Sequence, residues 1–345
     1  MHVKPVKHYA PHDAVATLSQ LLVKAASSYS GMTFYSLNNS EGIQISYSLL
    51  LDSAKEKAKL LHGMGEISPS MIFLLHFNSH LENIEWFWAA TLAGSLLAIS
   101  TPFANDLTQR RKHLVHLQNL LNKPVVLTTT ELLPEFLGNH ELKVRTVESL
   151  RSERGTTQIG HPIENSGDDV AVLMLTSGST GNAKAVPLQH SQILTSVRSK
   201  CAHHGTSKSS TFLNWIGLDH VADLTEIHLH AMSLCANRVH VQSADLLQDP
   251  LQFLKLLETH EVEYTFAPNF FLTKLRDCVD ANPGFKTDLK NLKALISGGE
   301  SNVVSTCTAD NPASKIWGGE RGDTTWFWHD GDLCWFHLFS TMPII

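Results

Sequence analysis

Short apolar runs alternate with amphipathic segments along most of the chain, and this alternation constrains the fold more than any other feature. Strands are expected at residues 42–47, 71–77, 95–100, 124–128, 169–175, 211–216, 238–241, 263–267 and 292–296. Helices are expected at residues 14–28, 48–63, 80–92, 106–121, 131–137, 188–201, 220–234, 250–260 and 269–279. Strands separated by helices form parallel, layered sheets, because each helix crosses a face of the sheet. The pattern therefore predicts an α/β fold with mostly parallel sheets.

A polar stretch without periodicity separates two such series. Residues 152–168 contain glycine and many polar side chains, which is typical of a loop or linker. We therefore expect one α/β subdomain in residues 1–160 and a second in residues 169–307. The remaining residues, 308–345, hold four of the seven tryptophans but show no helix or strand period. They do not resemble a core element.

Composition excludes several classes of function. A hydrophobic share of 43% and a charged share of 17% describe a globular chain, and a net charge of −6 without a basic cluster argues against nucleic acid as a partner. The longest apolar run, residues 86–99, is too short and interrupted to span a membrane, and no signal peptide is recognisable. Five scattered cysteines without a Cys-x-x-Cys pair indicate reduced thiols and a cytoplasmic location. The twenty histidines are spread out, and we assign no metal site.

One loop has the composition of an anion-binding site. Residues 175–184 are Leu-Thr-Ser-Gly-Ser-Thr-Gly-Asn-Ala-Lys, placed between an expected strand and an expected helix. Glycines let backbone N–H groups approach phosphate, the hydroxyls add donors, and the lysine adds positive charge. The candidate phosphate-binding residues are Thr176, Ser177, Gly178, Ser179, Thr180, Gly181 and Lys184. The loop lacks the spacing of a Walker motif, and composition alone also fits a surface loop rich in serine and glycine.

The loop resembles the phosphate loop of the adenylate-forming superfamily, which includes acyl-CoA synthetases, luciferase-like enzymes and adenylation domains of nonribosomal peptide synthetases (NRPS). The usual pattern there is Thr-Ser-Gly-Ser/Thr-Thr-Gly-x-Pro-Lys-Gly, and here Ala183 and Ala185 replace the proline and the last glycine. Residues 219–221, 266–271 and 297–304 are most similar to adenylation domains of fungal NRPS-like proteins of secondary metabolism. The resemblance runs from about residue 10 to residue 307.

This resemblance implies an acid–thiol ligase that uses ATP and Mg²⁺. In the family, a small carboxylic acid is activated to acyl-AMP, and the acyl group passes to the thiol of CoA or of a phosphopantetheine carrier protein. The phosphate loop would hold the ATP phosphates, and Lys184 would take part in catalysis. Neither a nucleic acid nor a membrane is implied as a partner, and the sequence does not specify the acid.

The resemblance also assigns residues around the acid. His220 would border the acyl group and steer its carboxylate, because imidazole can donate to a carboxylate oxygen. The alternative is that Asp219 caps a helix and that His220 is a surface residue of its first turn. Asn269 and Phe270 would also border the acyl group. Their alternative is a helix N-cap at Asn269, with Phe270 and Phe271 in the core.

A glycine pair follows the last expected strand. The segment of Gly298, Gly299 and Glu300 resembles the one whose backbone lies against adenine in the family. Glycine suits such a contact, because a flat base can approach a backbone that lacks a side chain. The alternative is an ordinary turn from a strand to a helix.

The family pattern stops near Cys307. Neither the Gly-x-Gly-x-Thr-Glu segment that binds Mg²⁺, nor the ribose-binding aspartate, nor the C-terminal subdomain with its catalytic lysine can be placed, so the chain is expected to be truncated and impaired. The codons for residues 326–336, read one base later, are compatible with Gly-Phe-Gly-Met-Thr-Glu-Thr-Cys-Ala-Gly, with three glycines forced. We hypothesise a one-base slip between about Cys307 and Lys315; the alternative is a chance match of degenerate codons, and the nucleotide sequence decides.

Two functions therefore stay open. The first is an adenylate-forming enzyme. The second is a non-catalytic ATP-binding or acyl-binding remnant, or a pseudogene product.

Overall fold

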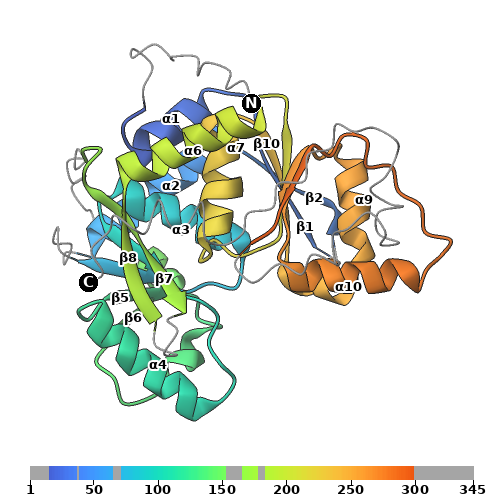
Figure 1. Cartoon of the computed structure of the whole chain (residues 1–345). Coiled ribbons are helices and arrows are strands. Elements are labelled where there is room, and N and C mark those ends of the chain that lie inside the picture. The colour runs from blue at the N-terminus through green and yellow to red at the C-terminus, as the bar shows by residue number, and fades with distance from the viewer. Residues whose placement is uncertain (1–14, 37–38, 65–70, 153–164, 178–182, 299–345) are drawn as a thin grey trace, which may run out of the picture.

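The computed structural model describes residues 15–36, 39–64, 71–152, 165–177 and 183–298, which form two six-stranded sheets with helices packed against them (Figure 1). Within these residues no helix is both long and apolar enough to cross a membrane. All strand pairs except two are parallel. The expected α/β fold with mostly parallel sheets is confirmed.

The first sheet has the strand order β6-β5-β3-β4-β7-β8. Its members are β3 (Ile72–Leu75), β4 (Leu96–Ile99), β5 (Val125–Thr128), β6 (Lys143–Thr146), β7 (Val170–Ser177) and β8 (Ala183–Gln189). Only β8 runs antiparallel to its neighbour. The central strands are buried on both faces, and Phe73, Leu74 and Leu75 have no exposed surface.

The second sheet has the order β12-β11-β9-β10-β1-β2. Its members are β1 (Gly31–Ser36), β2 (Asn39–Ser46), β9 (Thr211–Asn214), β10 (Asn237–Val241), β11 (Tyr264–Phe266) and β12 (Ala294–Ile296). Here β2 alone is antiparallel.

The sheets do not follow the expected division at residues 152–168. Strands β1 and β2, from the first half of the sequence, extend the sheet of β9 to β12, because Met32 to Tyr35 pair with Arg238 to Val241. Strands β7 and β8, from the second half, complete the sheet of β3 to β6. The segment around β1 was not expected to be a strand, and its pairing with β10 depends on residues about 200 positions away.

The helices are α1 (Leu18–Ala26), α2 (Tyr47–Gly63), α3 (His80–Leu92), α4 (Leu107–Leu120), α5 (Val147–Ser152), α6 (His190–His204), α7 (Leu229–Ser233), α8 (Ser243–Gln248), α9 (Leu251–Thr259) and α10 (Asn269–Asp280). A 3₁₀ turn, η2 (Leu133–Phe136), and a π-helix, η3 (Asp223–His228), complete the described elements. Side chains of Thr17, Ser46, Ser79 and Asp106 cap α1 to α4, because each accepts a backbone N–H three residues on.

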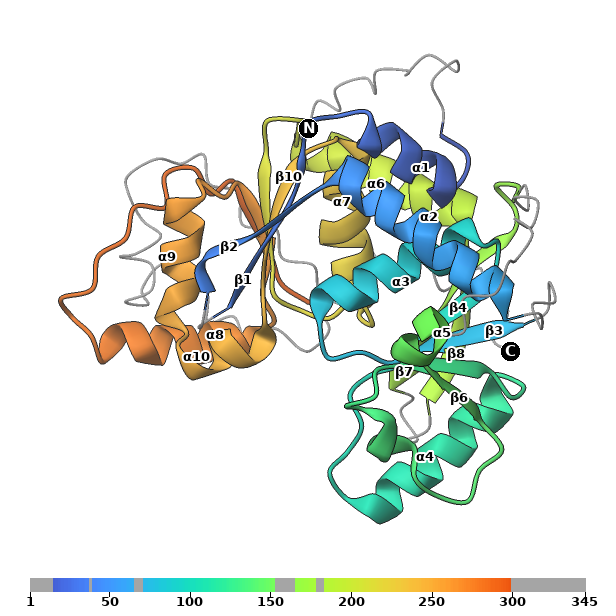
Figure 2. The same cartoon turned by 180° about the vertical axis from the view of Figure 1, so that it is seen from behind.

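The largest apolar core lies where α1, α2, α3 and α6 meet the strands of the first sheet. Helix α3 lies between the two sheets (Figure 2), and its Trp86 and Trp88 are fully buried. Helices α9 and α10 lie on the other side of the second sheet (Figures 1 and 2) and form a separate core around Phe253 and Phe271. The ends of both sheets are thereby fixed in place, and the candidate site residues lie at these ends.

Candidate functional site

Strands β7 and β8 form a hairpin around the expected phosphate loop. Thr176 pairs with Lys184, and Ser177 pairs with Ala183. The Thr176 side chain is half-buried, and the Lys184 side chain is exposed. Gly178, Ser179, Thr180 and Gly181 lie outside the described residues. Because β7 is parallel to β4 and β4 to β3, the hairpin tip lies at the edge where those strands end.

The helix expected at residues 188–201 is confirmed as α6, but the loop does not lead directly into it. Residues 183–189 form β8, and α6 begins only at His190, next to Gln189, which pairs with Val170 at the far end of the hairpin. The N-terminus of α6 therefore lies at the opposite end of the hairpin from Ser177 and Ala183. An anion at the expected loop would meet backbone N–H groups, hydroxyls and the Lys184 ammonium, without the dipole of α6.

The other candidate segments meet at the carboxyl edge of the second sheet. Trp215, just beyond β9, donates its Nε1–H to the carbonyl of Phe266 at 2.9 Å, and its ring lies 4.3 Å from that of Phe271. Ser243 donates its hydroxyl to the Trp215 carbonyl at 2.7 Å. Strand β11 is parallel to β9 and β12, so Gly298 lies at the same edge, where it is buried. Gly299 and Glu300 lie outside the described residues.

His220 is accessible beside a mostly buried carboxyl group. Its side chain is 64% exposed, whereas that of Asp219 is 10% exposed, and His220 Nε2 lies 3.7 Å from Asp219 Oδ2. Burial raises the pKa of Asp219, although the nearby His220 acts to lower it. The alternative in which Asp219 caps a helix is not observed, because Oδ2 has no hydrogen-bond partner among the described residues and the helix begins at Val221, directly after His220. Gly217 leaves room for this carboxyl group.

Two neighbouring phenylalanines have opposite environments. Phe271 is fully buried, whereas Phe270 is 51% exposed, so the alternative that places both in the core is wrong for Phe270. The helix N-cap is Pro268, and Asn269 is the first residue of α10 with a buried side chain. About half of the Phe270 side chain is thus accessible, while Phe271 packs against Trp215.

A buried polar network lies behind this edge and was not anticipated from the sequence. Arg238 on β10 is fully buried and donates to the carbonyl of His228 at 2.9 Å, and its guanidinium also contacts the His228 ring. Trp88 donates its indole N–H to the same ring at 3.0 Å. Burial is the main cause that lowers the pKa of His228, of His240 and of His80, the last to about 4.

Asp223 is the acidic member of this network. It is fully buried in the π-helix, and neither carboxyl oxygen has a hydrogen-bond partner among the residues that the structure describes. Burial raises its pKa well above the ordinary value, against the opposing effect of Arg238. The signal available in the sequence was polar residues within an expected strand, Arg238 and His240, but their partners are distant in the chain.

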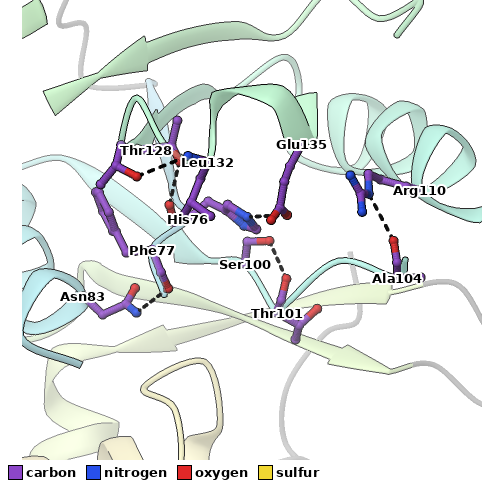
Figure 3. Close-up of polar contacts among 11 residues, drawn as sticks. His76, Phe77, Asn83, Ser100, Thr101, Ala104, Arg110, Thr128, Leu132 and Glu135 are labelled. Carbon is purple, nitrogen blue, oxygen red and sulfur yellow. Dashed lines mark hydrogen bonds and ion pairs between the residues drawn. The ribbon is translucent and has the colours of Figure 1, made fainter. Parts of the chain in front are cut away.

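The carboxyl edge of the first sheet is also polar. Figure 3 shows His76, directly after β3, with Nε2 3.2 Å from Glu135 Oε2 of η2. Thr128 donates its hydroxyl to the His76 carbonyl at 2.9 Å. The ring of Phe103 stacks on His76 at 4.2 Å. These contacts fix the strand ends beside the hairpin of β7 and β8.

Within the part of the chain that the structure describes, no group of three or more His, Cys, Asp or Glu side chains is arranged to hold a metal ion.

Comparison with known proteins gives consistent matches. The profile of the AMP-binding enzyme family matches residues 22–309. Microperfuranone synthase of Emericella nidulans is 55% identical over 294 residues, which cover 84% of this chain and 31% of that protein. The nonribosomal peptide synthetase acyN of Ascocoryne sarcoides is 47% identical over 274 residues, covering 78% and 30%.

Solved structures agree. The adenylation domain of a keto acid-selecting NRPS module bound to keto acyl adenylate has a TM-score of 0.76 at 25% identity, covering 86% of this chain and 54% of that one. The McyG A-PCP structure complexed with phenylalanyl-adenylate has a TM-score of 0.75 at 26% identity, covering 84% and 53%. The chain thus spans about 30% of the length of the curated relatives it matches.

Proposed function

The chain belongs to the family of AMP-binding enzymes, and from this premise we propose that it binds ATP and a small carboxylic acid and forms an acyl-adenylate in fungal secondary metabolism. The observation that carries the proposal is the β7–β8 hairpin, which places Lys184 opposite Thr176 at the base of the phosphate loop. The adenylation domains among the solved relatives support it.

The proposed reaction joins the acid to the nucleotide. A carboxylate oxygen attacks the α-phosphorus of ATP, the bond to the β-phosphate oxygen breaks, and pyrophosphate leaves with its electron pair. Thr176, Ser177, Gly178, Ser179, Thr180, Gly181 and Lys184 would hold the phosphates. Such a site acts by positioning and by compensating negative charge, to which Mg²⁺ bound with ATP adds.

The acid and adenine are proposed at the carboxyl edge of the second sheet. His220 and Phe270 expose their side chains there, and Asn269 begins the adjoining helix. His220 would orient the carboxylate, and Phe270 would cover the acyl group. The backbone of Gly298, Gly299 and Glu300 would border adenine.

The acceptor of the acyl group is proposed to be a thiol, from CoA or from a phosphopantetheine carrier protein. Attack of the thiolate on the acyl carbon would release AMP. A cytoplasmic location fits the three cysteines of the described residues, Cys201, Cys235 and Cys278, all of which are free thiols.

Lys184→Ala is expected to weaken ATP use strongly. Removal of one preorganised charge on the phosphates costs about 100-fold in rate by comparison with lost oxyanion donors. Exchange of labelled pyrophosphate into ATP in the presence of acid, together with titration of a fluorescent ATP analogue, measures the effect. Lys208→Ala is the control, because this exposed lysine precedes β9 at the opposite edge of the second sheet.

The same assay separates the two functions. ATP binding without exchange in the wild-type chain would favour a non-catalytic ATP-binding lobe. Equal ATP affinity in Lys184→Ala and the wild type would contradict the proposed role of the hairpin.

Phe270→Ala is expected to raise the KM for the acid about ten-fold and to leave the melting temperature nearly unchanged. The reason is that Phe270 is half exposed, so the exposed part of its ring would be covered by the acyl group. Exchange rates at varied acid concentration measure the effect. Leu137→Ala is the matched control, because Leu137 is 73% exposed but directly follows η2, which contacts β6 of the first sheet. Equal KM values in the two variants would remove Phe270 from the acid site.

A further inference from the structure

Helix α4 packs against the hairpin of β7 and β8. Leu114 and Leu117, three positions apart on one helix face, share an apolar cluster with Leu175 of β7 and Ala185 of β8. The helix therefore lies along the two strands that flank the phosphate loop, and its polar side chains are within reach of their ends.

His116 makes the polar contact between these elements. Its Nε2 lies 2.6 Å from the carbonyl oxygen of Ala183, the first residue of β8. A carbonyl only accepts, so Nε2 carries the proton and donates. The bond has the same sense in the neutral ring and in the imidazolium. Strand β8 ends the described sheet order, so it has a strand neighbour on one side only and a side chain supplies this further contact.

The helix is itself anchored, so it can position the strand. One turn before His116, the ring of His113 meets that of Phe103 edge-on at 5.7 Å. Phe103 stacks on His76, which is held by Glu135 (Figure 3). In addition, Arg110 donates from Nε to the carbonyl of Ala104 at 3.0 Å. The helix is thereby tied to the ends of β3 and β4.

We propose that His116 is a positioning residue, which holds the start of β8 through the Ala183 carbonyl and so keeps Lys184 opposite Thr176. It touches no ligand and acts through its neighbour on β8. The proposal rests on the proposed function in one respect, which is that Lys184 meets the ATP phosphates.

Three variants separate positioning from simple packing. His116→Leu keeps much of the side-chain volume but has no donor, whereas His116→Gln keeps an N–H donor. His140→Ala is the matched control, because His140 Nε2 bonds the Phe136 carbonyl at the same 2.6 Å, away from the hairpin. The melting temperature of each variant shows that it is folded.

Hydrogen exchange of the amides in residues 183–189 is the first measurement, and it needs neither ATP nor activity. One lost hydrogen bond is worth about 1 kcal/mol, so exchange in His116→Leu should be about five-fold faster. His116→Gln should exchange near the wild-type rate, and His140→Ala should not differ. Equal exchange in His116→Leu and the wild type overturns the proposal.

Titration of a fluorescent ATP analogue is the second measurement. His116→Leu should bind about five-fold more weakly, His116→Gln should recover, and the KM for the acid should stay constant. Faster amide exchange in His116→Leu with unchanged ATP affinity would show that the His116 contact does not position Lys184 for ATP. If the wild type binds no ATP, the proposed function fails, and the hold of His116 on β8 is then decided by exchange alone.

Discussion

Acidification from pH 7 to pH 4.5 is expected to remove several kcal/mol of folding free energy from this chain. Burial lowers the pKa of His80 and of His230 to about 4 each. The unfolded chain, with ordinary histidine pKa values near 6.5, therefore binds more protons in this range. The stabilisation is complete above about pH 6.5 and is lost as pH falls toward 4. By linkage each of the two groups contributes about 3 kcal/mol.

Whether acidification lowers the folding free energy overall depends also on the other buried titratable groups. The pKa is lowered by burial in six further histidines, His76, His113, His190, His228, His240 and His260. The pKa is raised by burial in three acids, Glu82, Asp219 and Asp223, which act with the opposite sign. The histidines outnumber the acids, so the net change is a loss of stability on acidification.

Urea unfolding at several pH values between 4.5 and 7 measures this loss. The slope of unfolding free energy against pH is proportional to the number of protons taken up on unfolding. In His80→Gln this number should fall by up to one, because one buried base is removed. His203→Gln is the control, since His203 is exposed. A free energy that does not change with pH would show that the buried histidines are protonated at no cost.

The central strands were predictable because burial on both faces demands continuous apolar residues. The run at Phe73 to Leu75 and that at Val125 to Leu127 are fully or nearly fully buried. Strand β8 was missed because its buried residues, Ala185 and Leu188, are three positions apart and do not alternate, and because it contains Pro187. Proline is tolerated on an edge strand, where one side of the backbone is unpaired. Its strand state comes from pairing with β7, which the local sequence does not report.

The site was predictable in its segments but not in its side-chain environments. Helical phase decides that Phe271 and not Phe270 faces Trp215, since α10 begins one residue earlier than a cap at Asn269 would place it. The buried network joins Trp88 to His228 and Arg238 to Met32, pairs that are 140 and 206 residues apart. Such contacts have no local signature.

Arg238→Met is expected to destabilise the fold by about 3–5 kcal/mol, as when one partner of a buried charged network is removed. The variant loses the hydrogen bond to the His228 carbonyl, the contact with the His228 ring and the packing of the guanidinium over Tyr47. The His228 carbonyl then loses a donor in a site without water access. Urea unfolding at pH 7 measures the change.

Asp223→Asn is the matched comparison and is expected to cost less than about 1 kcal/mol. Burial favours the protonated acid at Asp223, and within the described part of the chain its oxygens accept no hydrogen bond, so an amide of the same shape replaces it closely. Arg238 keeps its bonds to His228 in this variant. Equal losses in the two variants would instead show an ionised pair in which each charge depends on the other. A small loss in Asp223→Asn beside a large one in Arg238→Met would show that Arg238 is held mainly by His228 and by the aromatic face of Tyr47.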